Sequence, residues 1–304
     1  MTMIETTELT KQYGDITAVD SIDLTVDRGS IHGFVGHNGA GKSTTMQLLV
    51  GLITPTAGEA YIDGEPAGSV AATRKIGYAP QEPSFYESMT GRRYLRYMAD
   101  TAGLDGDIGE RVDDLLAQFG LEDAATQQID GYSGGMARKL SLAQAMIHDP
   151  ELLILDEPTA ALDPEGRASI IETLEEMTDD GLTVFVSSHV LSELEQFIDT
   201  VTIINEGKLI TSGPLETIRT VDKETYFLDT GDNDRMASLL AEQPAVGTVS
   251  HREDGRLTVR TDEPAAFRRE LPALLAEEGI PIRELEQETD LQEAFFELTD
   301  TGGA

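Results

Sequence analysis

Residues 36–44 read Gly36-His37-Asn38-Gly39-Ala40-Gly41-Lys42-Ser43-Thr44 and match the pattern G-x-x-x-x-G-K-[ST]. An apolar run, residues 31–35, precedes this stretch, and apolar residues at helical spacing follow it up to Gly51. In such a strand–loop–helix setting, glycines let successive N–H groups converge on phosphate oxygens at the start of a helix. The pattern therefore predicts a phosphate-binding loop, with Lys42 on the β- and γ-phosphates and Ser43 on Mg²⁺.

Two other interpretations of this loop are weaker. An ordinary glycine-rich turn needs neither the Lys-Ser pair nor the flanking strand and helix. A dinucleotide-binding fold requires G-x-G-x-x-G, which these glycines do not form.

The length and composition limit what the rest of the chain can be. Its 304 residues suffice for one large domain, or for one of about 200 residues with a smaller second one. No run approaches the roughly 18 apolar residues of a membrane helix, and no basic segment followed by an apolar one opens the chain. We therefore expect no membrane span, no signal peptide and a cytoplasmic location. The absence of cysteine fits a reducing compartment.

The charge is strongly negative, because 56 acidic residues against 22 basic ones give a net charge of −34. Such a surface repels nucleic acid, so we expect no nucleic-acid partner. The acids are spread along the chain and 39% of the residues are apolar, which disfavours disorder. Adaptation to high salt is the preferred explanation, since at molar ionic strength a Debye length of about 3 Å screens the internal repulsion.

Short strands are expected on both sides of the phosphate-binding loop, at residues 4–9, 22–26, 60–64 and 76–81. Tyr13 falls between the first two of these strands, so we expect it on a loop. An aromatic side chain there fits an adenine-stacking residue and an ordinary surface tyrosine equally well.

Residues 91–118 have apolar residues at helical spacing, and Arg92, Arg93 and Arg96 form a local basic cluster among them. The cluster fits either a solvated helix face or a docking site for a partner.

A second anion site is predicted at Ser133-Gly134-Gly135, because these residues precede the helical segment 136–147 and so lie at a helix N-terminus.

The apolar run 152–155 is typical of a buried parallel strand and ends in Asp156 and Glu157. Ligands bind at this edge of open α/β sheets. A strand-end Asp-Glu pair is often only a turn, but with a phosphate-binding loop upstream we favour a catalytic site. Asp156 is expected to hold Mg²⁺ through water, and Glu157 to orient and deprotonate the attacking water.

His189 directly follows another predicted strand, residues 182–188. A lone histidine is usually structural or exposed. Its position at the carboxyl end of a strand favours a contact with the γ-phosphate. A hairpin is expected next, with strands at 201–205 and 208–211.

Taken together, these residues resemble the nucleotide-binding subunit of ABC transporters over residues 1 to about 220. The resemblance rests on motifs in the family's order: the adenine-stacking Tyr13, the Walker A loop at 36–44, the Q-loop at Gln81, the signature Tyr132-Ser133-Gly134-Gly135-Met136, Walker B at Leu152–Asp156, the catalytic Glu157, the D-loop Ala161-Leu162-Asp163 and the switch His189. Tyr132 and Met136 stand where Leu and Gln are usual. This variant looks like that of export-type subunits of the drug-resistance and sodium-efflux kind.

The resemblance implies an α/β P-loop NTPase of ABC type, with a parallel-sheet core, an antiparallel β subdomain and a helical subdomain. It implies ATP and Mg²⁺ as cofactors, with Lys42, Gln81, Glu157 and His189 as catalytic residues and Gln81 beside Ser43 and Asp156 at the metal.

The resemblance also implies a head-to-tail pair, either a homodimer or a pair with a second ABC subunit. Ser133, Gly134 and Gly135 of one subunit would close over the ATP of the other. Separately encoded membrane permease subunits would dock after Gln81, at residues 83–86 and the Arg92-Arg93 cluster. The protein is thus expected to be peripheral on the inner face of the cell membrane.

Residues 221–304 carry none of these motifs again. Strands at 226–228, 247–250, 256–260 and 280–283 alternate with helices at 236–242 and 265–277, which predicts a small β-α-β-β-α-β accessory domain of α+β class. The segment 290–299 resembles the end of the same exporter subfamily, where such an appendix is thought to support dimerisation or regulation.

The favoured function is ATP hydrolysis at a shared dimer interface that drives transport, in the export direction, through separate membrane subunits. An ABC-type ATPase that regulates or remodels a membrane complex without moving a solute is the alternative. A non-enzymatic nucleotide sensor is disfavoured by Glu157 and His189.

Overall fold

The computed structural model of the chain describes all residues except 161, 180, 220–223, 253, 262 and 289–304. It divides into two compact units, Met1–Leu215 and Glu216–Ala304. The division lies close to the boundary at residue 220 that is expected from the sequence.

The centre of the first unit is a six-stranded sheet. Its strands are β4 (Ile31–Val35), β7 (Ile76–Ala79), β8 (Leu152–Leu155), β9 (Thr183–Ser188), β10 (Thr200–Asn205) and β11 (Lys208–Pro214). Their order is β11-β10-β4-β9-β8-β7, and every neighbouring pair is parallel except β10 and β11. Every residue of β4, β8 and β9 is buried, as expected for parallel strands covered on both faces.

The second sheet of this unit is antiparallel, and its strands come from the chain both before and after β4. It contains β1 (Thr2–Tyr13), β2 (Ile16–Ile22), β3 (Thr25–Asp27), β5 (Ala57–Ile62) and β6 (Glu65–Pro66). The expectation that Tyr13 lies on a loop is wrong, because β1 continues to Tyr13, which pairs with Ile16 of β2. Gly14, at φ +58°, and Asp15 alone make the turn, so a hairpin replaces the expected longer loop.

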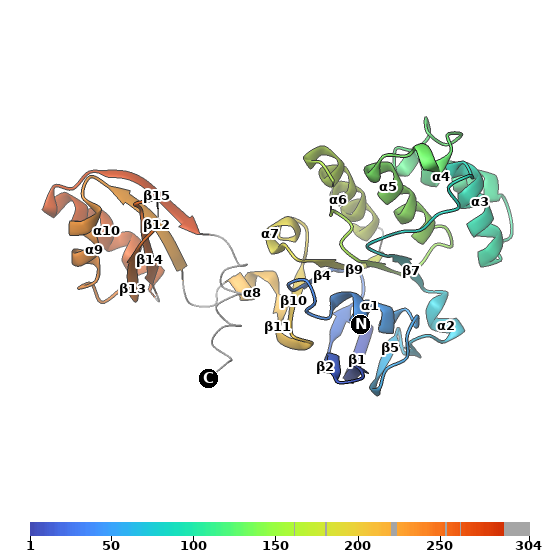
Figure 1. The fold of residues 1–304 in the computed structure, drawn as a ribbon, viewed down its shortest axis with the longest axis horizontal. Helices are drawn as coiled ribbons and strands as arrows, with labels where there is room; N and C mark the ends of the chain where they lie inside the picture. The colour runs from blue at the N-terminus through green and yellow to red at the C-terminus, as the bar shows by residue number, and fades with distance from the viewer. Residues whose placement is uncertain (161, 180, 220–223, 253, 262, 289–304) are drawn as a thin grey trace. The chain divides into compact units, whose positions relative to one another are not determined.

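The helices of the first unit are α1 (Lys42–Leu49), α2 (Val70–Thr73), α3 (Gly91–Ala102), α4 (Ile108–Gln118), α5 (Gly134–Ala145), α6 (Pro164–Asp179) and α7 (Leu191–Leu194), with the 3₁₀ turn η1 (Ile129–Gly131). A short helix, α8 (Leu215–Arg219), spans the boundary to the second unit. In Figure 1, α3, α4 and α5 gather on the side of this unit away from β1, β2 and β5. Thr90, Asp107 and Ser133 cap the N-termini of α3, α4 and α5 through their side chains. The helical subdomain expected from the sequence is therefore present.

One hydrophobic core joins the two sheets. Its buried side chains come from both sheets and from α1, and include Met3, Phe34, Met46 and Phe185. The rings of Phe34 and Phe185, on neighbouring strands, have centroids 5.2 Å apart. This packing fixes the strand and the helix on either side of residues 36–41.

The second unit has the element order β-α-β-β-α-β predicted from the sequence. Its elements are β12 (Glu224–Thr230), α9 (Asn233–Leu240), β13 (Thr248–His251), β14 (Leu257–Thr261), α10 (Pro264–Glu278) and β15 (Ile282–Glu288). The strands form one antiparallel sheet in the order β13-β14-β12-β15, and Tyr226, Leu228, Phe267 and Leu271 belong to its separate core. The segment 290–299 lies outside the described residues. Within the described part of the chain, no helix has the length and apolar character needed to cross a bilayer.

Candidate functional site

The residues that the sequence singles out follow the carboxyl ends of neighbouring parallel strands. The loop 36–41 follows β4, Gln81 follows β7, Asp156 and Glu157 follow β8, and His189 follows β9. Because parallel strands place these ends at one edge of the sheet, the side chains meet there. Lys42, Gln81 and His189 each contact the carboxylate of Glu157.

The loop 36–41 takes a conformation that depends on its glycines. Gly39 and Gly41 have φ angles of +86° and +110°, which side-chain-bearing residues rarely adopt. A Cβ atom on Gly36 would lie 2.4 Å from the carbonyl oxygen of Ile204, so only glycine fits there. Gly41 precedes α1 without a side-chain cap, and a Cβ on Gly39 would meet no atom within 4 Å. The N–H groups at the start of α1 thus face an open loop that fits a phosphate group.

Lys42 begins α1 and is buried, with 5% of its side chain exposed. Its Nζ donates to the carbonyl oxygens of Gly36 and His37 at 2.6 and 3.2 Å and lies 3.4 Å from Oε1 of Glu157. The ammonium group therefore links the backbone of the loop to a buried carboxylate of opposite charge.

Glu157 is the residue on which the site's contacts converge. Besides Lys42 at Oε1, its Oε2 lies 2.9 Å from Nδ1 of His189 and accepts from Nε2 of Gln81 at 3.5 Å. Its φ angle of +49° is unusual for a residue with a side chain. The Glu157 N–H donates to Oγ of Ser187 at 2.9 Å, which helps to hold this backbone in place.

Asp156 is held by the same serine. Ser187 Oγ donates to Oδ1 of Asp156 at 2.7 Å, and the Asp156 N–H donates to the carbonyl oxygen of Ala79 in β7. Asp156 is 3% exposed. A hydroxyl from Ser43 in α1 and a carboxylate from Asp156 are oxygen donors of the kind that Mg²⁺ prefers, so the residues present fit this ion.

Sequence reasoning missed two supporting residues, Ser187 and Asn205. Asn205 ends β10, and its Oδ1 lies 2.6 Å from Nε2 of His37 in the loop. Both are polar residues at the carboxyl end of an apolar strand, the same signal that identified Asp156 and His189.

The signature residues lie at the surface of the first unit. Ser133 accepts a hydrogen bond from the Met136 N–H as the N-cap of α5, and Ser133 and Gly134 are exposed. Among the described residues, no hydrogen bond or ion pair joins Ser133, Gly134 or Gly135 to residues 36–44. The structure therefore does not bring these two predicted anion sites together within one chain.

Asp163 is exposed and accepts the Gly166 N–H at 2.8 Å at the start of α6. Ala161, the first residue of the same predicted D-loop, lies outside the described residues. Tyr13 is 49% exposed at the end of β1, and Nζ of Lys11 lies 5.0 Å from its ring centroid.

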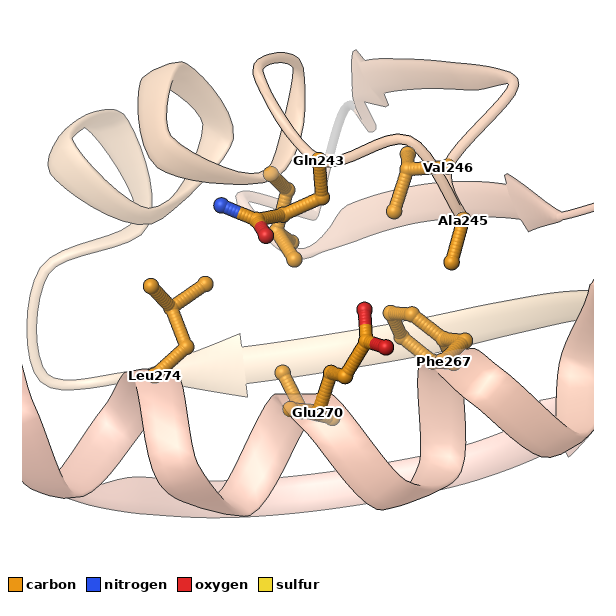
Figure 2. Close-up of a pocket in the computed structure, with 8 residues that line it drawn as sticks. Gln243, Ala245, Val246, Phe267, Glu270 and Leu274 are labelled. Carbon is orange, nitrogen blue, oxygen red and sulfur yellow. The ribbon is translucent and has the colours of Figure 1, made fainter.

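The second unit contributes none of these side chains. Its core contains a small pocket of about 10 Å³, room for no more than one water molecule. Figure 2 shows Phe267, Glu270 and Leu274 reaching into it from α10, with Gln243, Ala245 and Val246 on the opposite side. A pocket of this size cannot hold a nucleotide.

Comparison with known proteins agrees with this geometry. The family model described as ABC transporter matches residues 19–160. The bacitracin transport ATP-binding protein BcrA of Bacillus licheniformis is 34% identical over 305 residues, which cover 99% of this chain and 98% of the relative.

Solved structures show the same fold over a smaller share of the chain. The structure of an ATP-binding subunit of an ABC transporter has 31% identity and a TM-score of 0.66, over 71% of this chain and 92% of its own. A dimeric ATP-binding cassette in a post-hydrolysis state, bound to ADP and Pi, has 25% identity and a TM-score of 0.65, over 70% of this chain and 99% of its own.

Proposed function

Because the chain belongs to the ABC transporter family, as an ATP-binding subunit and ATPase, we propose that it drives export of a solute through separately encoded membrane subunits. The observation that supports ATP hydrolysis, the driving reaction, is the position of Glu157, whose carboxylate contacts Lys42, Gln81 and His189 at the carboxyl edge of the sheet. A general base beside a phosphate-binding loop is the arrangement that ATP hydrolysis needs.

In the proposed site, the loop 36–44 binds the ATP phosphates, and Tyr13 stacks on the adenine. Lys42 exchanges its contact with Glu157 for the β- and γ-phosphates. Glu157, released from the lysine, orients the attacking water and takes its proton, while His189 and Gln81 keep the carboxylate in place. Ser43, Asp156 and Gln81 would hold Mg²⁺, and the bound ion would neutralise phosphate charge.

We assign the signature residues to the ATP of a second subunit. Ser133 and Gly134 are exposed and lie apart from the loop of their own chain, which suits a site completed by a partner. The dimeric cassette of similar fold supports this pairing. The partner is a second copy of the chain or another ABC subunit, and Asp163, also exposed, lies at the same interface.

The membrane subunits are assigned to the surface around the start of α3. Tyr86 and Tyr97 are 55% and 41% exposed there, with ring centroids 5.4 Å apart. Arg92 forms an ion pair with Asp113, and Arg93 and Arg96 are exposed on the same helix. An aromatic and basic surface in an acidic chain supports a protein partner. Such docking would make the chain peripheral on the inner face of the membrane.

A role in solute transport is supported by similarity to BcrA over nearly the whole chain, because that relative is a bacitracin transport ATP-binding protein. The same similarity extends through residues 216–304, to which we assign an accessory role in dimerisation or regulation. The net charge of −34 supports a protein adapted to high salt.

Glu157→Gln tests the catalytic assignment, because the amide keeps the shape of the carboxylate but cannot act as a base. We expect turnover to fall by about 10²- to 10⁴-fold. ATP binding should persist, since Lys42 and Asp156 remain. Because hydrolysis separates the paired subunits, the variant should elute as a dimer with ATP and as a monomer with ADP in size-exclusion chromatography in multimolar KCl.

The matched control is Glu151→Gln, an exposed carboxylate at the other end of β8. It should keep wild-type turnover and stay monomeric after hydrolysis. Wild-type phosphate release by Glu157→Gln would remove Glu157 from the catalytic role. If turnover is lost but no dimer forms with ATP, two copies of this chain do not complete a shared ATP site without other subunits.

A further inference from the structure

Arg138 is a buried cation at the junction between α5 and the end of β7. It is 7% exposed, and its guanidinium donates to two successive carbonyl oxygens, those of Pro80 at 2.8 Å and Gln81 at 2.7 Å. No carboxylate of the described residues lies within ion-pair distance of it. Arginine keeps its charge in proteins, so this is a buried charge satisfied only by main-chain oxygens.

The surroundings of Arg138 connect it to the catalytic carboxylates. Burial lowers the pKa of its guanidinium, and the negative charges of Asp156 and Glu157 oppose that shift. Arg138 therefore lies in the electric field of the site although it touches neither carboxylate. A buried charge is costly to maintain, which favours a role beyond filling space.

Arg138 joins α5 to the residues just after β7, and a second close contact joins the same helix to the strand itself. At the other end of the strand, a Cβ on Gly77 would lie 2.3 Å from the carbonyl oxygen of Ala145, so helix and strand are in direct backbone contact there. These two contacts hold α5 against β7 and the residues that follow it. This helix and strand carry Ser133 at the start of α5 and Gln81 just after β7.

We propose that Arg138 is a positioning residue of the ATPase. It fixes the backbone at Pro80 and Gln81 so that the Gln81 side chain faces Glu157, and it ties this arrangement to the helix that begins at Ser133. The inference rests on the proposed role of Gln81 and adds the residue that holds Gln81 in place.

The first test uses Arg138→Met, which keeps most of the volume without the charge, and Arg138→Lys, which keeps the charge without the two-pronged donor. We expect kcat of Arg138→Met to fall by about 10- to 100-fold. The affinity for a fluorescent ATP analogue should stay within about twofold of wild type, because no nucleotide contact is changed. The kcat of Arg138→Lys should lie between those of the wild type and Arg138→Met. Lys139→Met is the control, since Nζ of Lys139 points instead to Ser169 of α6, and it should leave kcat unchanged.

The second test is a double-mutant cycle with Gln81→Ala. If Arg138 acts through Gln81, the Arg138→Lys substitution should lower kcat in the wild type and have little further effect in Gln81→Ala. A merely structural role would give equal effects in both backgrounds and would overturn the proposal.

The remaining outcomes are also decisive. Unchanged kcat in Arg138→Lys and Arg138→Met, or loss of nucleotide affinity together with turnover, would overturn the role of Arg138. Full activity of Gln81→Ala would instead overturn the proposed role of Gln81. If Arg138→Met does not fold, as judged by circular dichroism, Arg138→Lys and its cycle carry the test.

Discussion

At the scale of single residues, His32 in β4 shows how a polar group is accommodated beneath the phosphate-binding loop. It is 2% exposed, and its Nε2 and Nδ1 lie 2.7 and 2.8 Å from the hydroxyls of Thr202 and Thr200. Hydroxyl groups both donate and accept, so they satisfy either tautomer of a neutral ring. Burial lowers the pKa of His32 to about 4, and the ring is uncharged at neutral pH.

This buried ring should make the protein sensitive to acid. The unfolded chain binds a proton at His32 near pH 6.5, and the folded protein only near pH 4, so stability falls as the pH drops through this window. Between pH 7 and pH 5 we expect His32 to remove about 2 kcal/mol from the free energy of unfolding. His32→Gln should lose this share of the pH dependence in urea titrations in high salt.

His251→Gln is the control for His32, because His251 lies at the surface of the second unit, and it should keep the full pH dependence. Identical losses of stability in wild type and His32→Gln between pH 7 and pH 5 would contradict the prediction.

The positions of the site residues could be read from the sequence, but their hydrogen-bond partners could not. Glu157 and His189 each follow an apolar strand closely, and local pattern is enough to place them at a strand end. The contact of His37 with Asn205 depends instead on β4 pairing with β10, which no local pattern reveals. Tyr13 lies in a strand and not on the expected loop, because the turn after it has only two residues and is shorter than the polar stretch suggests.

At the scale of elements, the start of α3 is joined to the segment just before the signature. The N–H groups of Arg92 and Ile129 donate to the carbonyl oxygens of Ala125 and Met89, both at 3.0 Å. Tyr132 closes this contact, with its hydroxyl donating to Ala124 at 2.9 Å while its ring packs over Gly91. Tyr132, which directly precedes the signature Ser133, therefore links this serine to the start of α3, where the docking surface is proposed.

Gly91→Ala should disturb this contact, because its Cβ would lie 2.2 Å from the Tyr132 hydroxyl oxygen. We expect a loss of about 1 to 3 kcal/mol in the free energy of unfolding, as in other overpacked sites. Tyr132→Leu, the residue usual at this position in the family, should recover part of that loss in the Gly91→Ala background. Urea unfolding of the two single variants and the double variant measures both effects.

Gly109→Ala serves as the comparison, since its Cβ would meet only the ends of the Arg96 and Asp107 side chains in the first turn of α4. It should be neutral or slightly stabilising, because alanine favours the helix. Equal stability of Gly91→Ala and Gly109→Ala would show that Tyr132 moves aside freely.

At the scale of the whole molecule, the net charge of −34 is the dominant property. Within the part of the chain that the structure describes, the ion pairs, such as those of Arg28 with Asp63 and Glu151, engage only a minority of the carboxylates. The remaining carboxylates repel one another wherever salt does not screen them. Stability should therefore depend on the ionic strength of the solvent.

Circular dichroism should show a more completely folded protein in multimolar KCl than in 0.1 M KCl, with the transition reversing on dialysis. Above about 1 M salt the Debye length of about 3 Å is shorter than the spacing of most surface charges. Sorbitol at matched osmolality should not replace KCl if screening is the cause. A spectrum and melting temperature that are the same at both salt concentrations would rule out the high-salt adaptation.

The order of strands in the six-stranded sheet also has a consequence for biosynthesis. β4 lies between β9 and β10, which begin only at Thr183 and Thr200, whereas α3 to α5 contact each other within residues 91–145. Local contacts form early and distant ones late. On the ribosome, the helices between Gly91 and Ala145 should thus fold first, while the strand before the phosphate-binding loop waits for its neighbours. We therefore expect a nascent chain to acquire its ATP site only after Asn205 has emerged, and a nonsense codon before that point to leave a product without nucleotide binding.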